Sequence, residues 1–262
     1  MFHYSKAVLR VGPSILNYYL FKLKRWAKNV EKYPREKRFS VLKRMCEKIS
    51  KALNVDIHVF GLENIPVDTN YCLICNHMSA YDPVPFIINC PGYTTFVAKK
   101  ELSKIIMIKQ AIATIEGVYI DRDNLRQSLK MMLGVEEDLK KGEKNWMIFP
   151  EGTRIRDQLL PVDNFHHGTF RPAWKAGVPI VPAAVYGTFR VLKKKPQFKR
   201  YPIYISILKP IMPLESSKLN TSDLAKLTHD AIQREITYHL RPLDHKIMSE
   251  NKEKNYKFND IL

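Results

Sequence analysis

From residue 55 onward, short apolar runs rich in β-branched and aromatic residues alternate with longer segments whose apolar residues recur at helical spacing. The runs predict strands at 56–60, 71–75, 94–98, 118–121, 146–149, 180–186 and 203–208. Helices are predicted at 84–89, 103–114, 125–140 and 169–176, and Thr221 or Ser222 can cap a last helix. This alternation is typical of an α/β fold with a central sheet covered by helices.

The first 53 residues have a different pattern, with two basic amphipathic segments. Between Ile15 and Trp26, apolar side chains fall on one arc of a helix and basic side chains on the opposite side. Arg10 and Lys22 limit the apolar stretch to eleven residues, whereas a transmembrane helix needs about 20. A second such segment follows Pro34. The pair fits an anchor lying in a membrane interface, and two helices packed on the main domain with charged faces outward are the alternative.

Charge adds a preference for polyanions. The 262 residues include 43 Lys or Arg and 26 Asp or Glu, a net charge of +17. Residues 1–53 hold fourteen of the basic and three of the acidic residues, so the excess is regional. Nucleic acid, anionic lipid headgroups and an acidic protein are all compatible with it. No helix-turn-helix, zinc or base-stacking motif accompanies the charge or the basic cluster at 190–200, so nucleic acid is the weaker alternative.

Cysteine usage indicates a reducing compartment. Four cysteines form no disulfide framework, and no cleavable signal peptide precedes them, which predicts a cytoplasmic location. Cys72 and Cys75 have the spacing of half a zinc or redox site, but residues three apart in a strand point to opposite faces. We therefore interpret these thiols as buried core residues and expect no metal site.

The first candidate site is the segment Asn76-His-Met-Ser-Ala-Tyr-Asp82-Pro83, which directly follows a predicted buried strand. Loops at such strand ends carry the active sites of open α/β sheets. His77 can take a proton from a hydroxyl, and Asp82 can fix its tautomer and stabilise the imidazolium. An Asp before a Pro also fits a helix N-cap, and a lone histidine is more often structural, so the segment alone leaves both interpretations open.

The second candidate site is Phe149-Pro-Glu-Gly-Thr-Arg154, again immediately after a predicted strand. Gly152 permits a tight backbone, Thr153 offers a hydroxyl, and Arg154 has a planar fork that suits phosphate oxygens. These features fit an anion-binding turn. An ordinary strand-to-loop turn with a surface arginine is the alternative.

Together the two segments resemble part of the four-block signature of the glycerolipid acyltransferase family, specifically the 1-acylglycerol-3-phosphate acyltransferases. The His-x4-Asp block is similar to His77 through Asp82, and the Gly-x4-Arg block to Gly117 through Arg122. The third block is similar to Phe149 through Arg154, and the proline-containing fourth to Val178 through Ala183. The resemblance covers roughly residues 55–190, and the basic N-terminus resembles the two-helix membrane element of single-chain bacterial members.

The resemblance implies a central mixed, largely parallel sheet flanked by helices. We expect three parts: an N-terminal two-helix membrane anchor over 1–53, an acyltransferase domain over 54–243, and a polar, Lys-rich tail over 244–262. The implied location is the cytoplasmic face of the cell membrane, where the enzyme would be peripheral and would contact anionic lipids.

The resemblance also implies a reaction, the transfer of a fatty acyl group from acyl-coenzyme A or an acyl carrier protein to the sn-2 hydroxyl of lysophosphatidic acid. The thioester is a co-substrate, and no cofactor is implied. His77 would be the base and Asp82 its orienter. The residues implied for the acceptor site are Lys100 (or its neighbour Lys99), Gly117, Arg122, Glu151, Gly152, Thr153 and Arg154.

Two departures from the family pattern leave the acceptor open. His166 and His167 occupy a segment where the family often has Phe-Lys-x-Gly, and Ile155 stands where Ser is common. Glycerol 3-phosphate or another lysophospholipid is therefore the alternative acceptor. A lipid-binding module without catalysis is a further alternative, and the intact His77 and Asp82 argue against it.

Overall fold

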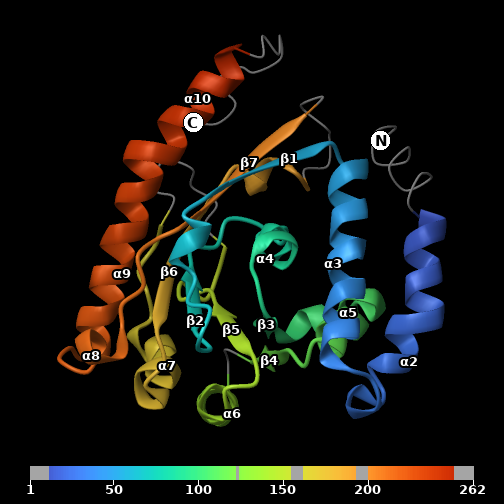
Figure 1. The fold of residues 1–262 in the computed structure, drawn as a ribbon, viewed down its shortest axis with the longest axis horizontal. Coiled ribbons are helices and arrows are strands. Elements are labelled where there is room, and N and C mark those ends of the chain that lie inside the picture. The colour runs from blue at the N-terminus through green and yellow to red at the C-terminus, as the bar shows by residue number, and fades with distance from the viewer. Residues whose placement is uncertain (1–11, 122–123, 155–161, 193–199, 251–262) are drawn as a thin grey trace.

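The computed structural model describes residues 12–121, 124–154, 162–192 and 200–250. Its centre is a seven-stranded sheet in the order β1-β7-β6-β2-β5-β3-β4 (Figure 1). Among the strand pairs in the described ranges, only β6 and β7 run antiparallel, so the prediction of a mixed, largely parallel sheet is confirmed. All seven predicted strands are present: β1 (Val55–Phe60), β2 (Cys72–Cys75), β3 (Thr94–Lys99), β4 (Val118–Ile120), β5 (Asn145–Ile148), β6 (Ile180–Tyr186) and β7 (Tyr201–Ile207).

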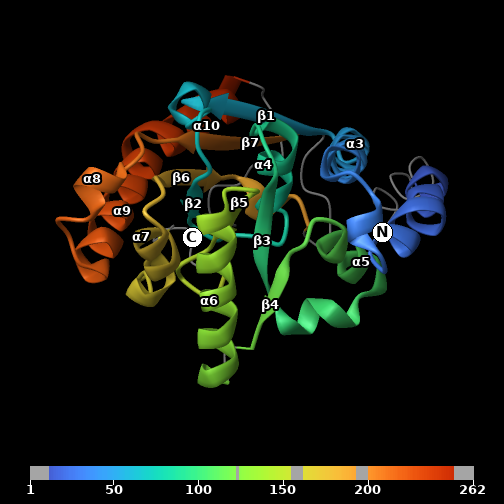
Figure 2. The same ribbon diagram turned by 60° about the horizontal axis from the view of Figure 1, so that its bottom comes forward.

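Helices cover both faces of this sheet (Figure 2). One face carries α3 (Arg35–Ala52), α4 (Pro83–Asn89) and α5 (Ile106–Thr114), and the other carries α6 (Leu125–Lys141), α7 (Arg171–Ala176) and α9 (Thr221–Glu235). Successive residues of β2 enter the two cores alternately. Cys75 packs with α3 and α4, whereas Cys72 packs with α6 and α7, as the strand interpretation predicts.

Three helix starts differ from the sequence prediction. The segment predicted as one helix at 103–114 is a 3₁₀ turn, η4 (Lys100–Lys104), followed by α5 after an extended residue at Ile105. Helix α7 begins at Arg171 with a proline in its first turn, after the 3₁₀ turn η5 (His167–Phe170). Helix α9 is capped by Asn220, not by Thr221 or Ser222, because the Asn220 side chain accepts two backbone N–H groups.

The N-terminal helix runs over residues 12–26 and includes a π-helical stretch, η1 (Tyr19–Leu23), and α2 (Lys24–Trp26). A 3₁₀ turn, η2 (Val30–Lys32), then leads into α3. Part of the apolar arc of the N-terminal helix is buried, because Ile15, Leu23 and Trp26 pack against α3. The exposed apolar residues of this helix are Leu16, Leu20 and Phe21. No helix in the described ranges is both long and apolar enough to cross a bilayer.

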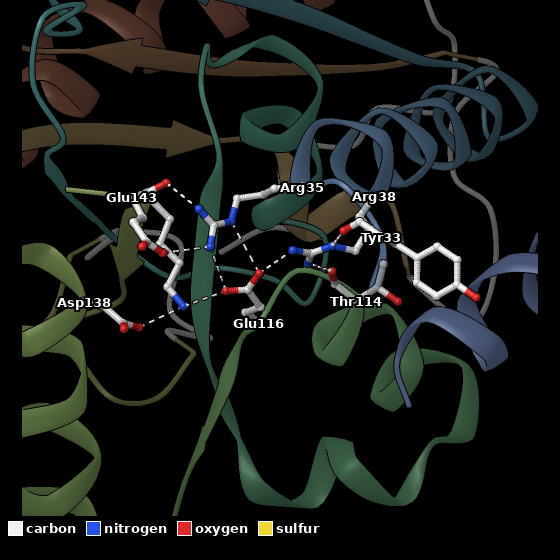
Figure 3. Close-up of polar contacts among 8 residues, drawn as sticks. Tyr33, Arg35, Arg38, Thr114, Glu116, Asp138 and Glu143 are labelled. Carbon is white, nitrogen blue, oxygen red and sulfur yellow. Dashed lines mark hydrogen bonds and ion pairs between the residues drawn. The ribbon is translucent and has the colours of Figure 1, made fainter. Parts of the chain in front are cut away.

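An ion network holds α3 to the α/β domain (Figure 3). Glu116, in the turn between α5 and β4, pairs with Arg38 and with Arg35 of α3, the latter at 3.3 Å. It also accepts a hydrogen bond from Lys144, at 3.2 Å, and Arg35 reaches Glu143 at 3.1 Å. Arg38 and Lys144 are buried. The second predicted anchor helix is thus joined to the domain by charge as well as by apolar packing.

This network should make the free energy of unfolding depend on pH. Burial alone would raise the pKa of Glu116, but hydrogen bonds from Arg38 and Arg35 and the charge of Lys144 lower it to about 2. Because the folded pKa lies below the ordinary value of 4.5, the stabilisation is complete above that value and disappears as the pH falls toward 2. We expect Glu116→Gln to lower the free energy of unfolding by about 1–3 kcal/mol at pH 7.

Urea unfolding of Glu116→Gln and the unsubstituted protein between pH 7 and pH 3 tests this expectation. The difference between them should shrink below about pH 4.5. Glu143→Gln is the matched control, because the Glu143 side chain is 59% exposed and contributes one outer contact. A difference that stays constant over this pH range would contradict the assigned role of Glu116.

The C-terminal part of the chain is packed further than predicted. Helix α9 continues through a π-helical stretch, η7 (Ile236–Leu240), into α10 (Arg241–Glu250). Asp244 is fully buried, where it pairs with the buried Arg190, and Met248 is buried beside Tyr201. Residues 244–250 therefore belong to the packed structure and not to a polar tail, because Arg190 requires a buried counter-charge. Residues 251–262 lie outside the described ranges.

Candidate active site

The predicted site residues follow strands that end at one edge of the sheet. Strands β2, β5, β3 and β4 are parallel neighbours, so their carboxyl ends meet there. The segment from His77 to Asp82 follows β2, and the segment ending at Arg154 follows β5. Lys99 ends β3. Arg122, which follows β4 in the sequence, lies outside the described residues.

His77 and Asp82 form the pair that their spacing predicts. The Nδ1 atom of His77 lies 2.6 Å from Oδ2 of Asp82. A carboxylate oxygen can only accept, so Nδ1 carries the proton and the lone pair of the ring is on Nε2. The ring also stacks on Phe149 with 4.2 Å between centroids, which fixes its plane. The histidine is therefore held in the tautomer that can accept a proton.

The Asp82 carboxylate is fully buried and is surrounded by donors. Its Oδ2 atom also accepts the backbone N–H groups of Met78 and Ser79, at 2.7 and 2.8 Å. Its Oδ1 atom accepts from the hydroxyl of Thr188, in the 3₁₀ turn η6 (Thr188–Arg190) after β6. The carboxylate makes no capping bond to α4, so the expected N-cap role is not realised. The loop N–H groups take the place of the helix N–H groups.

Glu151 stabilises the loop that carries His77 and Asp82. Its side chain accepts the backbone N–H of His77 at 2.9 Å and that of Asp163 at 3.4 Å. Burial is the main reason that its pKa rises to about 9, and the nearby charge of Asp82 adds to the rise. Glu151 is 4% exposed, and the next three residues line the cavity. The structure thus places Glu151 behind the histidine and not on the cavity wall.

A cavity of about 1560 Å³ opens in front of His77. Much of its wall is apolar and comes from α3, α4 and α5, including Met45, Ile49 and Ala111. Another part is polar or basic. The basic lining residues of this part are Lys99, Arg154, His166, His167 and Arg171, and polar or acidic side chains such as Thr153, Thr169, Thr221, Ser128 and Glu136 also line the cavity. Gly152, with a φ of 68°, forms the turn that brings Thr153 and Arg154 to this wall.

The structure separates the two candidate lysines. Both pair with a carboxylate, Lys99 with Glu101 at 3.0 Å and Lys100 with Asp121 at 2.7 Å, but only Lys99 of the two lines the cavity. Gly117 has a packing role, because a β-carbon there would lie 2.7 Å from a methyl group of Ile112 in α5. Lys99 is therefore the better candidate for a substrate contact, and Gly117 allows β4 to approach α5.

Comparison with known proteins agrees with this geometry. The family model described as Acyltransferase matches residues 56–186, a range that contains both candidate segments. The chain belongs to the acyltransferase family. It is 28% identical to the probable 1-acyl-sn-glycerol-3-phosphate acyltransferase of Mycoplasma pneumoniae, over 83% of this chain and 85% of that protein. It is also 28% identical to the 1-acyl-sn-glycerol-3-phosphate acyltransferase of Borreliella burgdorferi, over 75% and 78% of the two chains.

A solved structure supports the same assignment. The crystal structure of the 1-acyl-sn-glycerophosphate (LPA) acyltransferase PlsC from Thermotoga maritima superposes on this acyltransferase with a TM-score of 0.67. The two are 27% identical, and the superposition covers 87% of this chain and 89% of the other. The similarity therefore extends beyond the range that the family model matches.

The sequence analysis predicted no role for two residues that hold the site of this acyltransferase together. Thr188 bonds to Asp82 across 106 positions of the chain. Asn76 joins β2 to β6, because its side chain exchanges two hydrogen bonds with the backbone of Val185. Asn76 directly precedes His77, which was a usable signal, whereas no local pattern marks Thr188.

We expect the Glu151 side chain to act through its shape and not through a negative charge. In this acyltransferase, Glu151→Gln should keep at least about a tenth of the activity, because an amide oxygen can still accept the N–H of His77. The amide nitrogen would replace the oxygen that makes the longer bond to Asp163. Glu151→Ala leaves a buried N–H without its partner, so kcat should fall by about 10²-fold.

Steady-state kinetics of both variants decides the point. Equal and severe losses would show that the charge of Glu151 is needed, and that its assignment as a neutral support is wrong. Thermal unfolding of each variant separates a loss of activity from a loss of fold.

Proposed function

We propose that this acyltransferase moves a fatty acyl group from a thioester to the sn-2 hydroxyl of lysophosphatidic acid, giving phosphatidic acid. The observation that carries the proposal is the cavity, because the paired His77 borders a space with an apolar wall on one side and a basic wall on another. An acyl chain fits the first wall and a phosphate the second. The names of the two relatives given above specify this acceptor, which supports lysophosphatidic acid as the proposed substrate.

His77 and Asp82 would perform the proton transfers. Nε2 of His77 removes the proton of the acceptor hydroxyl. The hydroxyl oxygen attacks the carbonyl carbon of the thioester at the same time, and a C–O bond forms. The C–S bond then breaks, and the leaving thiolate takes the proton from the imidazolium. Asp82 stabilises that imidazolium, since its carboxylate is already held by Met78, Ser79 and Thr188. Positioned general-base catalysis of this kind contributes about 10²–10⁴-fold.

The two walls would hold the substrates for this step. Lys99 and Arg154 line the cavity with exposed side chains and suit an acceptor phosphate. The family signature implies a role in the acceptor site for Arg122, which lies outside the described residues. The apolar wall would take acyl chains, since pockets for drug-sized ligands hold about 300–1,000 Å³ and this cavity is larger. Holding both substrates together supplies much of the remaining acceleration.

We also propose that the enzyme is peripheral at the cytoplasmic face of the cell membrane. Its acceptor resides in a bilayer, and the N-terminal helix exposes Leu16, Leu20 and Phe21 together with basic side chains. Each basic residue near an anionic leaflet contributes about 1 kcal/mol. Anionic lipids and the lysophospholipid are the proposed partners, and the acyl donor is either acyl-coenzyme A or an acyl carrier protein.

A purified-enzyme assay with each acceptor and donor tests the function. Lysophosphatidic acid should give a kcat/KM at least about tenfold above that of glycerol 3-phosphate or a neutral lysolipid, because a site with cationic side chains and an apolar wall recognises both parts of this acceptor. Acyl-coenzyme A and acyl carrier protein are compared in the same assay. Faster acylation of glycerol 3-phosphate would reject the proposed acceptor and retain the chemistry.

A further inference from the structure

Three consecutive apolar side chains are exposed where η4 gives way to α5. Ile105 is 50% exposed, Ile106 62% and Met107 38%. Single exposed apolar residues are common on protein surfaces, but a continuous group of them marks an interaction site. We call Ile105 and Ile106 the α5 tip.

The rest of α5 shows why the tip is unusual. Its sequence, Ile-Met-Ile-Lys-Gln-Ala-Ile-Ala-Thr, is mostly apolar, yet Thr114 is its one buried residue. The side of α5 that includes Met107, Ile108 and Ala111 lines the cavity. An ordinary surface helix would turn polar residues outward on its other side. Here the helix that forms the cavity wall begins with apolar side chains that face solvent.

Charge around the tip indicates what it contacts. Lys104 and Lys109 are exposed on either side of it. Helix α5 packs against η1, and the two lie on the same side of the molecule, near α3 (Figure 2). The N-terminal helix adds the exposed Leu20 and Phe21. Apolar side chains with flanking lysines are typical of segments that enter the interface of an anionic leaflet.

We propose that the α5 tip inserts into an anionic bilayer and that the cavity opens to the membrane beside it. The acceptor lipid then moves from the leaflet along Met107 and Ala111 to His77, with its acyl chain on the apolar wall of α5. This inference rests on the proposed function for the identity of the lipid. The membrane contact itself depends on the surface alone.

The first experiment measures binding to vesicles of phosphatidylcholine with and without phosphatidylglycerol. The double variant Ile105→Ser/Ile106→Ser should bind the anionic vesicles at least about fivefold more weakly than the unsubstituted enzyme. Val67→Ser/Leu214→Ser is the matched control, because these side chains are 83% and 75% exposed and lie on other elements. Equal binding by the tip variant and the control would overturn the inference.

Activity separates this inference from the proposed function. Neither Ile105 nor Ile106 lines the cavity, so the double variant should acylate a water-soluble, short-chain acceptor at the unsubstituted rate without vesicles. Its rate on lysophosphatidic acid embedded in vesicles should fall by the same factor as its binding. An unsubstituted enzyme that acylates neither acceptor rejects the proposed function, whereas the vesicle-binding result still decides the membrane contact.

A labelling experiment covers the case in which the serine variants fold poorly. Three native cysteines are buried and Cys90 is partly exposed, so Ile106→Cys is labelled with a polarity-sensitive fluorophore in a Cys90→Ser background. Emission should shift to the blue on anionic vesicles and be quenched by brominated lipid, whereas a label at Leu214→Cys should not respond. No shift at position 106, or a concentration-dependent dimer that the tip substitutions abolish, would overturn the inference.

Discussion

Replacing His77 with alanine should lower kcat by about 10²–10⁴-fold, the contribution of a positioned general base. The substitution removes the atom proposed to take the proton, Nε2, and leaves the loop in place. Glu151 holds the backbone N–H of residue 77, and the buried Asp82 keeps its bonds to Met78, Ser79 and Thr188. Binding to vesicles and the thermal unfolding temperature should therefore change little.

Single-turnover acyl transfer measures the effect on the chemical step. His239→Ala is the control, because His239 is an exposed histidine of η7 that pairs with Glu235 at the end of α9. It should turn over at the unsubstituted rate. A His77→Ala enzyme that keeps more than about a tenth of its rate would exclude general-base catalysis by this residue.

Asp244→Asn should give the largest loss of stability, about 3–5 kcal/mol of the free energy of unfolding. The Asp244 carboxylate and the Arg190 guanidinium are both almost fully buried and form a two-bond pair. An amide keeps the volume but leaves the positive charge in the core without its counter-charge. Because Arg190 shares the η6 turn with Thr188, activity should also fall when the Thr188 bond to Asp82 is disturbed.

Chemical denaturation with matched activity assays tests this prediction. Glu250→Gln, at the end of the same helix, is the control, because its contact with Lys246 spans 4.0 Å between exposed side chains. It should change stability by less than about 0.5 kcal/mol. A similarly small change in Asp244→Asn would show that Arg190 is stabilised without Asp244.

The strands of the sheet could be predicted because each has a recognisable local sequence pattern. Central parallel strands are buried on both faces and read as continuous apolar runs, as in Cys72-Leu-Ile-Cys75, where every residue is buried. The pair His77 and Asp82 could be predicted because both ends of the interaction lie in one loop, so the spacing is visible. In these cases the local sequence contains both the residue and its partner.

Partners that are distant in the sequence could not be predicted in this way. Thr188, Glu116 and Asp244 bond to residues 106, 78 and 54 positions away. A polar side chain in a loop or a helix gives no sign of which distant residue will satisfy it. The local sequence around Asp244 therefore predicts a polar tail, whereas in the structure Asp244 pairs with the buried Arg190.

Amphipathic periodicity left a different ambiguity. It identifies an apolar face but not the surface that covers that face, and a neighbouring helix and a bilayer give the same period. In the N-terminal helix, one part of the apolar face is covered by α3 and another part is exposed. Ile15, Leu23 and Trp26 lie on α3, whereas Leu16 and Leu20 remain exposed.

The network around Glu116 has a consequence for building chimaeras from related enzymes. Arg35 and Arg38 are complemented by residues that follow α5 and precede β5, about 80 and 110 positions further along the chain. Grafting the N-terminal helices of another enzyme onto this domain would leave Glu116 and Lys144 facing side chains to which they are not matched. The smallest transferable module therefore comprises α3 together with the turn at Glu116 and Gly117, so a graft that replaces the N-terminal helices also alters the start of β4.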